Sequence, residues 1–375
     1  MAVANVRGER DGRSASSQRP PLWSIGATAL LLLAGFGGRP HAAPTVDRER
    51  GSAASGRTAG DGRGRNATSP AEIPAKGWKD IILRVYRGIS EDRVLANAAG
   101  VVFFALLALF PGIAALVSIY GLFADPVSIS QHLDTATGVL PGGALDVIRG
   151  QLTQLTSQGR GTLGVSFIVG LGISLWSANG GMKALFDALN VVYEEQEKRS
   201  FIRLNMTSLI FTLGMLVFLL TALGAMVVLP VALNHVPLHE MTTLILKVAR
   251  WPVLLVLVAL GLALIYRYGP SRREPQWRWI TPGSAFAAVV WVVASLLFSW
   301  YAANFGSFNK TYGSLGAVIG FMTWMWLSII VILVGGKLNA EIEHQTARDS
   351  TKGGGKPLGT RHAKMADEVG APQGL

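Results

Sequence analysis

The stretch "VLANAAGVVFFALLALFPGIAALVSIYGLFA" (94–124) contains no Asp, Glu, Lys, Arg or His. An α-helix needs about 20 predominantly apolar residues to cross the hydrocarbon core of a bilayer, so this stretch is long enough to span a membrane. Five further intervals also lack ionisable residues, namely 161–182, 204–233, 251–266, 279–303 and 311–336. The sequence therefore predicts an all-α protein, a polytopic membrane bundle of six transmembrane helices.

The composition supports a membrane protein. Half of the 375 residues are hydrophobic and only 15% are charged, whereas soluble domains carry about 25% charged residues. Lys and Arg are frequent in the segments 71–94, 183–203, 267–280 and the tail from 337, and scarce in 123–160, 234–246 and 304–314. Because short basic connectors are retained in the cytoplasm, this alternation predicts that the N and C termini of the bundle are both cytoplasmic.

Several function classes are disfavoured by the residue inventory. The net charge of +11 is explained by the connectors, and no basic stripe is interleaved with aromatics, so we expect no nucleic-acid partner. The chain has no cysteine, which excludes thiolate chemistry. We find no phosphate-binding glycine loop, no serine elbow and no carboxylate cluster at metal-binding spacing. We therefore expect no cofactor, no metal site and no enzyme activity.

The first seventy-five residues are expected to form a disordered basic extension. Its apolar patch "LWSIGATALLLLAGFGG" (22–38) follows several arginines, as in a signal peptide, but "RPHAAP" (39–44) is a poor cleavage site. A signal peptide, an extra span and an unused upstream start remain open alternatives. The membrane domain is expected over 76–345, followed by a disordered cytoplasmic tail over 346–375.

Two features of the spans are candidates for a solute path. Pro111 and Gly112 lie near the middle of the first predicted span, and a proline there removes a backbone donor, so we expect a helix break or kink. A kink without a function is the alternative. The interval 251–266 is short for a span and is flanked by Arg250 and Arg267. Arg250 either lines a pathway or snorkels to the interface.

The segment "NFGSFNKTYGSLG" (304–316) is expected to be the outer hairpin between the last two spans. It is longer than a simple turn requires, and its amide, hydroxyl and phenol groups suit a headgroup, an ion or a sugar. The alternative is an interfacial loop with Tyr312 in the aromatic belt. The residues that we select as substrate-path candidates are Asn179, Arg250, Asn304, Asn309, Tyr312, Asn339 and Glu341.

Five motifs follow one another in the order of a known family. They are "GVVFFALLALFPGIAALVSIYGLFADP" (100–126), "LWSANGGMKALFDALNVVYEEQEKRSF" (175–201), "RWPVLLVLVALGLALIYRYGPSRR" (250–273), "SWYAANFGSFNKTYGSLGAVIGFMTWMWLS" (299–328) and "GGKLNAEIE" (335–343). Together they resemble the YihY/BrkB family of bacterial inner-membrane proteins, which carries the legacy name ribonuclease BN. The resemblance covers about residues 78–345 and implies six spans in the plasma membrane with both ends inside. The family usually has an acidic residue where this chain has Lys337.

The residues and the resemblance together favour a transporter or permease-like protein for an anionic or amphipathic solute, including a lipid, in envelope maintenance. Its expected partners are membrane lipids and envelope-assembly proteins. A non-transporting scaffold for envelope assembly is the alternative from another class. The ribonuclease of the legacy name is disfavoured, because phosphodiester hydrolysis normally needs metal-binding carboxylates or histidines at one site.

Overall fold

The computed structural model describes residues 62–121, 163–223, 240–305 and 315–373. All of them belong to one compact unit, Arg57–Leu375. Within these ranges the regular structure is helical, and the only bridge is an isolated one between Pro275 and Thr351. The prediction of an all-α protein is confirmed for the described residues. The elements, in order, are η1 (Pro70–Glu72), α2 (Ala75–Glu91), α3 (Val94–Gly121), α6 (Leu163–Val192), α7 (Phe201–Leu223), α9 (Glu240–Tyr268), α10 (Trp277–Phe305), α12 (Leu315–His344) and α13 (Lys364–Asp367).

Five helices are long and apolar enough to cross a membrane. The candidate spans are Val94–Ile113, Phe201–Ala222, Trp251–Tyr268, Trp277–Tyr301 and Val318–His344, and each coincides with a predicted span. The described part of the remaining predicted span, 161–182, lies in α6, which is not among the five. Several large apolar side chains on these helices are more than half exposed, including Phe103, Leu107, Ile210 and Leu296. Such exposed apolar surface is expected where a helix faces lipid.

Of the break or kink predicted in the first span, a break is not seen, and the kink stays a prediction. α3 continues as one helix from Val94 to Gly121 with Pro111 inside it. α3 makes its most extensive contact with α6, and Gly112 lies close to Ala178 of that helix. Neighbouring helices allow a proline to be kept inside a membrane helix, because they help to satisfy the freed backbone group.

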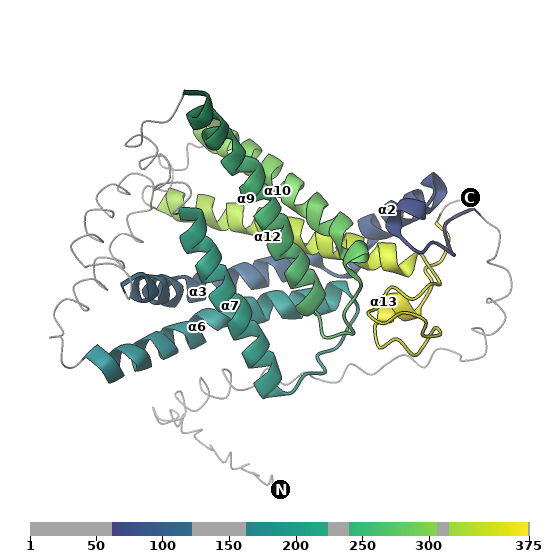
Figure 1. Ribbon diagram of the computed structural model, residues 1–375, viewed down its shortest axis with the longest axis horizontal. Helices are drawn as coiled ribbons and strands as arrows, with labels where there is room; N and C mark the ends of the chain where they lie inside the picture. The colour runs from purple at the N-terminus through teal and green to yellow at the C-terminus, as the bar shows by residue number, and fades with distance from the viewer. Residues whose placement is uncertain (1–61, 122–162, 224–239, 306–314, 374–375) are drawn as a thin grey trace, which may run out of the picture. The chain divides into compact units, whose positions relative to one another are not determined.

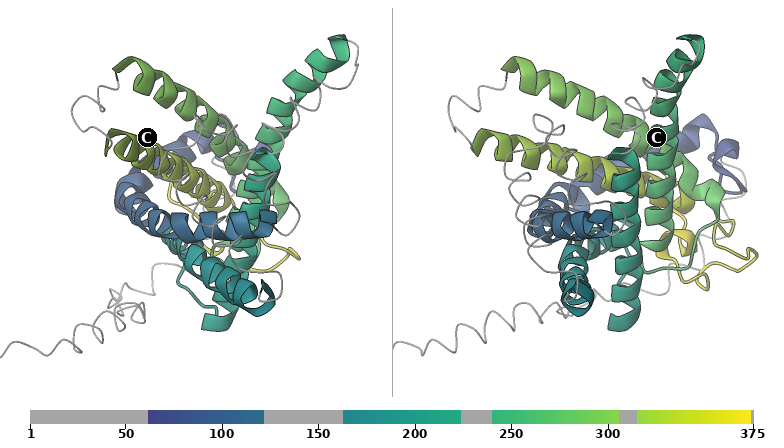
Figure 2. Two further views of the ribbon diagram at one scale, coloured as in Figure 1. Left: turned by 90° about the vertical axis from the view of Figure 1, so that its left-hand side faces the viewer. Right: turned by 60° about the vertical axis from the view of Figure 1, so that its left-hand side comes forward.

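The three helices α9, α10 and α12 pack closely around small residues (Figure 1 and Figure 2). A Cβ atom on Gly335 of α12 would lie 2.6 Å from the Tyr266 hydroxyl and 2.7 Å from Ala287. A Cβ atom on Gly283 of α10 would meet the Gly335 carbonyl and the Asn339 side chain. Tyr266 is fully buried and donates a hydrogen bond of 2.7 Å to the carbonyl of Ile332. The two glycines therefore allow the helices to approach backbone to backbone, as in other membrane helix pairs.

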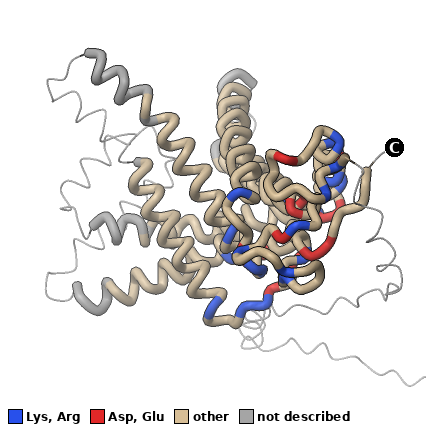
Figure 3. Tube along the Cα trace, turned by 45° about the vertical axis from the view of Figure 1, so that its right-hand side comes forward, with Lys and Arg blue, Asp and Glu red and all other residues tan. Residues whose placement is uncertain are grey.

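The charged residues gather at one end of the helices (Figure 3). The basic segments 71–94, 183–203, 267–280 and the tail from 337 meet there, although they are far apart in sequence. This arrangement agrees with the prediction that these segments lie on one side of the membrane.

The chain after α12 packs against this end of the bundle. The Arg361 guanidinium donates hydrogen bonds to the carbonyls of Ala347, Arg348, Lys356 and Ala366. The backbone N–H of Lys364 donates to Glu195 Oε1 at 2.7 Å. The sequence predicts a disordered tail over 346–375; residues 346–373 of that tail belong to the compact unit Arg57–Leu375 and carry these hydrogen bonds. The predicted N-terminal extension is described only from residue 62, and residues 62–75 also contact the body, since the Arg63 guanidinium pairs with Asp80 at 2.8 Å.

We expect Gly283→Ala to lower the thermal unfolding midpoint of the detergent-purified protein. The added methyl group would meet a backbone carbonyl that cannot move aside cheaply, and overpacking of this kind typically costs about 1–3 kcal/mol. The matched control is Gly261→Ala in α9, where a Cβ atom would meet nothing within 4 Å. Equal unfolding midpoints for the two variants would contradict the close approach of α10 and α12.

Candidate functional site

The structure describes only some of the predicted path residues at the level of side chains. Asn309 and Tyr312 lie outside the described residues. Arg250 and Asn304 lie in α9 and α10, but their side chains are not among those described. The outer part of the predicted path therefore stays a prediction. The other three candidates, Asn179, Asn339 and Glu341, have described and buried side chains.

Asn179 is the centre of a polar cluster between α6 and α7. Its Oδ1 accepts a hydrogen bond of 3.3 Å from the Thr212 hydroxyl, and its Nδ2 lies 3.5 Å from Asn205 Oδ1. Asn179 is fully buried, and Asn205, Ser208 and Thr212 are also buried. The three α7 residues follow one another at intervals of three and four, so they share one helix face. Asn179, Asn205, Ser208 and Thr212, together with Lys183, are named the α6–α7 polar cluster below.

Lys183 brings a positive charge into this cluster. Its Nζ donates a hydrogen bond of 3.1 Å to Asn205 Oδ1 and lies 5.5 Å from the centre of the Trp176 ring. Within the described residues Lys183 makes no ion pair. Asp187, four residues later on α6, is exposed and is not its partner. The ammonium group is therefore held by a neutral amide and an aromatic face.

We did not select Lys183, Asn205 or Thr212 from the sequence. The signal that could have found the α7 residues is the recurrence of Asn, Ser and Thr at 205, 208 and 212 inside a predicted span. The signal for Lys183 was its place at the end of an otherwise uncharged interval. Neither signal shows that α6 and α7 cross so that these side chains meet.

Asn339 joins two helices. Its Oδ1 accepts a hydrogen bond of 2.8 Å from the backbone N–H of Gly283, and the residue is fully buried. This bond ties α12 to the first turns of α10, next to the close glycine contact. The geometry assigns Asn339 a packing role.

Glu341 belongs to an ion network that links α2, the turn after α2 and α12. Its Oε2 accepts a hydrogen bond of 2.6 Å from Arg84 Nε, and its Oε1 lies 3.4 Å from Lys337 Nζ. Lys337 Nζ also lies 2.9 Å from Asp92 Oδ2 and 3.9 Å from Glu194 Oε1. Lys337, which stands where the family usually has an acidic residue, is only 3% exposed and is surrounded by three carboxylates. Four residues, Arg84, Asp92, Lys337 and Glu341, are named the Lys337 network below.

The C-terminal segment also contributes a cation to the charged end of the bundle, where this cation pairs with Glu194. Lys364 Nζ lies 2.7 Å from Glu194 Oε2. Burial alone would raise the pKa of Glu194, but the hydrogen bond and the positive charge of Lys364 outweigh it and hold that pKa below its usual value. At Asp92, by contrast, burial raises the pKa of the carboxyl in spite of the opposing charge of Lys337. The charge of Lys337 thus opposes the effect of burial on the pKa of the Asp92 carboxyl.

No metal centre is apparent in the described part of the chain. Among those residues no group of three or more His, Asp or Glu side chains could hold a metal ion. The arrangement offers charge, amides and hydroxyls, which suit binding of an anion or of a polar headgroup.

We expect Lys337→Met to destabilise the protein strongly, because it removes the cation that pairs with Asp92 and leaves that carboxylate close to Glu194 and Glu341. Removing one partner of a buried ion pair costs about 3–5 kcal/mol, which would appear as a lower thermal unfolding midpoint in detergent. The double variant Lys337→Met with Asp92→Asn should recover part of the loss. Lys76→Met, at an exposed position of α2, is the matched control. An unfolding midpoint of Lys337→Met equal to that of the control would refute the network.

Comparison with known proteins places this chain among membrane proteins. The sequence profile of the family described as "Virulence factor BrkB" matches residues 85–357. The chain is 31% identical to the "Putative ribonuclease-like protein YfkH" of Bacillus subtilis (strain 168) over 65% of this chain and 88% of the relative. It is 24% identical to the "UPF0761 membrane protein PSHAa0171" of Pseudoalteromonas translucida (strain TAC 125) over 69% of this chain and 85% of the relative. A UPF0761 membrane protein of Vibrio atlanticus (strain LGP32) is also 24% identical, over 68% of this chain and 80% of the relative. No solved structure matches the chain.

Proposed function

Because the chain belongs to the virulence factor BrkB family of membrane proteins, we propose that it is a multi-pass plasma-membrane protein that moves an anionic or amphipathic solute, with lipids included in that class. The observation that carries this proposal is the α6–α7 polar cluster. It places one lysine and several amide and hydroxyl groups between two long apolar helices. The charged end of the bundle is taken to face the cytoplasm, as the rule for basic connectors requires.

The depth of the cluster supports a path. Thr212 lies 11 residues after Phe201, the first residue of α7, which corresponds to about 16 Å at about 1.5 Å per residue. The hydrocarbon core is about 30 Å thick, so Thr212 and its partner Asn179 lie well inside the span. Polar and ionisable side chains at such depth usually mark the route of a substrate or an ion.

The lysine distinguishes a path from simple helix packing. Asn, Ser and Thr often hydrogen-bond across membrane helices and hold them together, and this would account for the contact of Asn179 with Thr212. Packing gives no reason for Lys183, whose ammonium group has a neutral hydrogen-bond partner. A cation without a counter-charge is suited to attract an anionic group, and the amides can replace the water that the anion loses.

We expect the wild-type protein, reconstituted in vesicles, to move at least one of a panel of labelled phospholipids and small anions faster than empty vesicles do. Lys183→Met should lower this flux about tenfold or more, because a hydrogen bond to a charged group contributes about 1.5–3 kcal/mol. Lys79→Met, at an exposed position of α2, removes the same charge away from the cluster and should leave the flux unchanged.

Two outcomes would contradict the proposal in different ways. Wild-type flux no greater than that of empty vesicles for every compound would remove transport and favour the scaffold for envelope assembly. Flux that is the same in the wild type and in Lys183→Met would show that the solute does not pass the α6–α7 polar cluster.

The proposed orientation can be tested by labelling, because the chain has no cysteine. Single cysteines at Lys79, Ser200 and Lys352, which are exposed at the charged end, should react with a membrane-impermeant maleimide only in inverted vesicles or permeabilised cells. A cysteine at Ser128, in the segment 123–160, should react in intact cells. Reaction of position 200 from outside the cell would reverse the orientation, and different sides for positions 79, 200 and 352 would contradict the shared end.

A further inference from the structure

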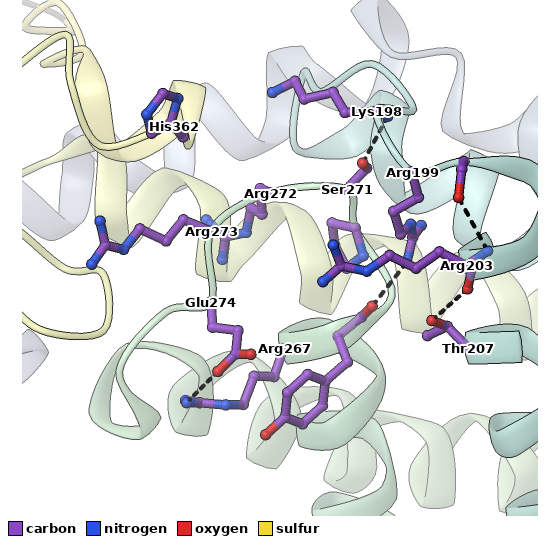
Figure 4. Close-up of a pocket in the computed structure, with 13 residues that line it drawn as sticks. Lys198, Arg199, Arg203, Thr207, Arg267, Ser271, Arg272, Arg273, Glu274 and His362 are labelled. Carbon is purple, nitrogen blue, oxygen red and sulfur yellow. Dashed lines mark hydrogen bonds and ion pairs between the residues drawn. The ribbon is translucent and has the colours of Figure 1, made fainter.

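We propose that a basic pocket at the charged end of the bundle is a binding site for a phosphate group carried by a small molecule or a lipid headgroup. The pocket has a volume of about 480 Å³ and is separate from the α6–α7 polar cluster. It lies where the connector between α6 and α7, the first turns of α7, the connector between α9 and α10, and the C-terminal segment come together (Figure 4). Its charged lining consists of Lys198, Arg199, Arg203, Arg267, Arg272 and Arg273, with Glu274 as the one carboxylate.

The charges around the pocket do not balance. Four of the six cations have a carboxylate partner, in the pairs Lys198–Glu195, Arg199–Glu197, Arg267–Glu274 and Arg272–Glu343. The other two, Arg203 and Arg273, have no carboxylate partner within the described residues. Arg273 Nη2 donates to the carbonyl of Lys352 at 2.7 Å, which leaves its charge uncompensated. The pocket therefore has an excess of two positive charges.

Paired arginines form the fixed wall of the pocket. Arg199 Nη2 donates to Glu197 at 2.7 Å and to the carbonyl of Gly269 at 2.8 Å. Burial would raise the pKa of Glu197, but the hydrogen bonds from Arg199 outweigh it and lower that pKa to about 2. The guanidinium of Arg267 lies 4.7 Å from the centre of the Trp277 ring and 5.4 Å from that of Tyr268. Arg199 and Arg267 are thus held by contacts within the protein and form the walls of the site. Arg203 and Arg273, which have no carboxylate partner in the described residues, are available to a ligand.

The two connectors are also held to each other. The backbone N–H of Lys198 donates to the Ser271 hydroxyl at 2.9 Å, and the backbone N–H of Ser271 donates to Asn190 Oδ1 at 2.7 Å. Because the walls are fixed before a ligand arrives, little ordering entropy is lost on binding. A preformed site of this kind differs from a loose set of surface lysines.

The chemistry of the site matches phosphate. Guanidinium groups present parallel N–H donors that bind phosphate oxygens in pairs, and the charges of Arg203 and Arg273, which have no carboxylate partner in the described residues, attract the negative charge of a phosphate group. The volume falls within the about 300–1,000 Å³ typical of small-molecule sites, so the pocket has room for an organic group attached to the phosphate. Tyr268 on the wall adds an aromatic surface for that group.

The position of the pocket is compatible with two sources of phosphate. It lies at the ends of candidate spans, since Arg203 is in the first turn of α7 and Arg267 is in the last turn of α9. Basic pockets at this level of membrane proteins bind lipid headgroups. A soluble phosphorylated compound would reach the same side chains from water. The shared chemistry is the phosphate group, and the experiment separates the two sources.

One face of α7 serves this pocket and another face serves the polar cluster. Ser200, Arg203 and Thr207 line the pocket, whereas Asn205, Ser208 and Thr212 belong to the α6–α7 polar cluster. Binding of phosphate at the first face does not require transport along the second. The phosphate site can therefore exist whether or not the protein transports a solute.

The test uses the full-length protein purified in a non-ionic detergent and two probes, inorganic phosphate and phosphatidylglycerol. Binding of inorganic phosphate is measured as the shift of the thermal unfolding midpoint with concentration. Binding of phosphatidylglycerol is measured by native mass spectrometry, with phosphatidylcholine as the neutral reference lipid. We expect the wild type to bind at least one probe, and the double variant Arg203→Gln with Arg273→Gln to bind it at least tenfold more weakly. Arg278→Gln, at an exposed arginine of the same end that is not in the pocket lining, should change binding less than twofold.

The outcomes are distinguishable. Binding of phosphatidylglycerol alone assigns the site to a lipid headgroup, and binding of inorganic phosphate alone assigns it to a soluble phosphate compound. The proposal is overturned if the wild type binds neither probe, or if Arg278→Gln weakens binding as much as the double variant does. Should the double variant fail to fold, Arg203→Gln alone decides the question, since Arg203 is exposed and its removal breaks no ion pair in the described part of the chain. That single variant must then bind at least threefold more weakly than the wild type.

Discussion

The cost of leaving a charge unpaired in hydrocarbon organises the described part of this protein. Translocon-based scales put one Lys, Arg or Asp at the centre of a membrane helix at about 2.5–3.5 kcal/mol, and a buried charge without a partner is costly in any apolar interior. Buried ionic groups are accordingly paired where the helices end. Arg272 and Glu343 form an ion pair of 2.7 Å with both side chains almost fully buried, and Arg84 and Glu341 form another at 2.6 Å. These pairs connect α2, α12 and the connector after α9 at the charged end of the helices. The apolar remainder of the helices can then face lipid. Lys183 has a neutral hydrogen-bond partner and no carboxylate partner within the described residues, and for that reason it is the residue on which a path is proposed.

Properties that are set by the local composition of each segment were predictable from the sequence. The helical class and five of the spans followed from uncharged intervals, and the grouping of basic segments at one end followed from their alternation. These properties depend on local composition alone, so they can be predicted without knowing which segments lie together in space. The continuity of α3 through Pro111 was not predictable, because proline only weakens a helix and the surrounding helices decide whether it breaks.

Contacts between distant segments could not be predicted, and they give a structural role to two candidates. Asn339 and Glu341 were selected because polar residues near the end of a span suggest a path. The structure gives Asn339 a backbone partner in α10 and Glu341 a partner in α2, so both hold helices together. The carboxylates that surround Lys337 come from three different segments, and nothing in the local sequence announces them. The same holds for the basic pocket, whose cations come from the connector before α7, from α7, from the end of α9 and from the connector after α9.

The packing of residues 346–373 has a practical bearing on how the protein is handled. A terminal stretch rich in Gly, Lys and small residues is commonly trimmed before purification, or replaced by a reporter at the end of the last hydrophobic segment. Here such trimming would remove Ser350, whose hydroxyl donates to Glu343 at 2.8 Å, and Lys364, which neutralises Glu194. It would also take away His362 and open one side of the basic pocket. Versions of the chain shortened in this way would thus be altered proteins, and affinity tags are better placed after residue 375 than within 346–373.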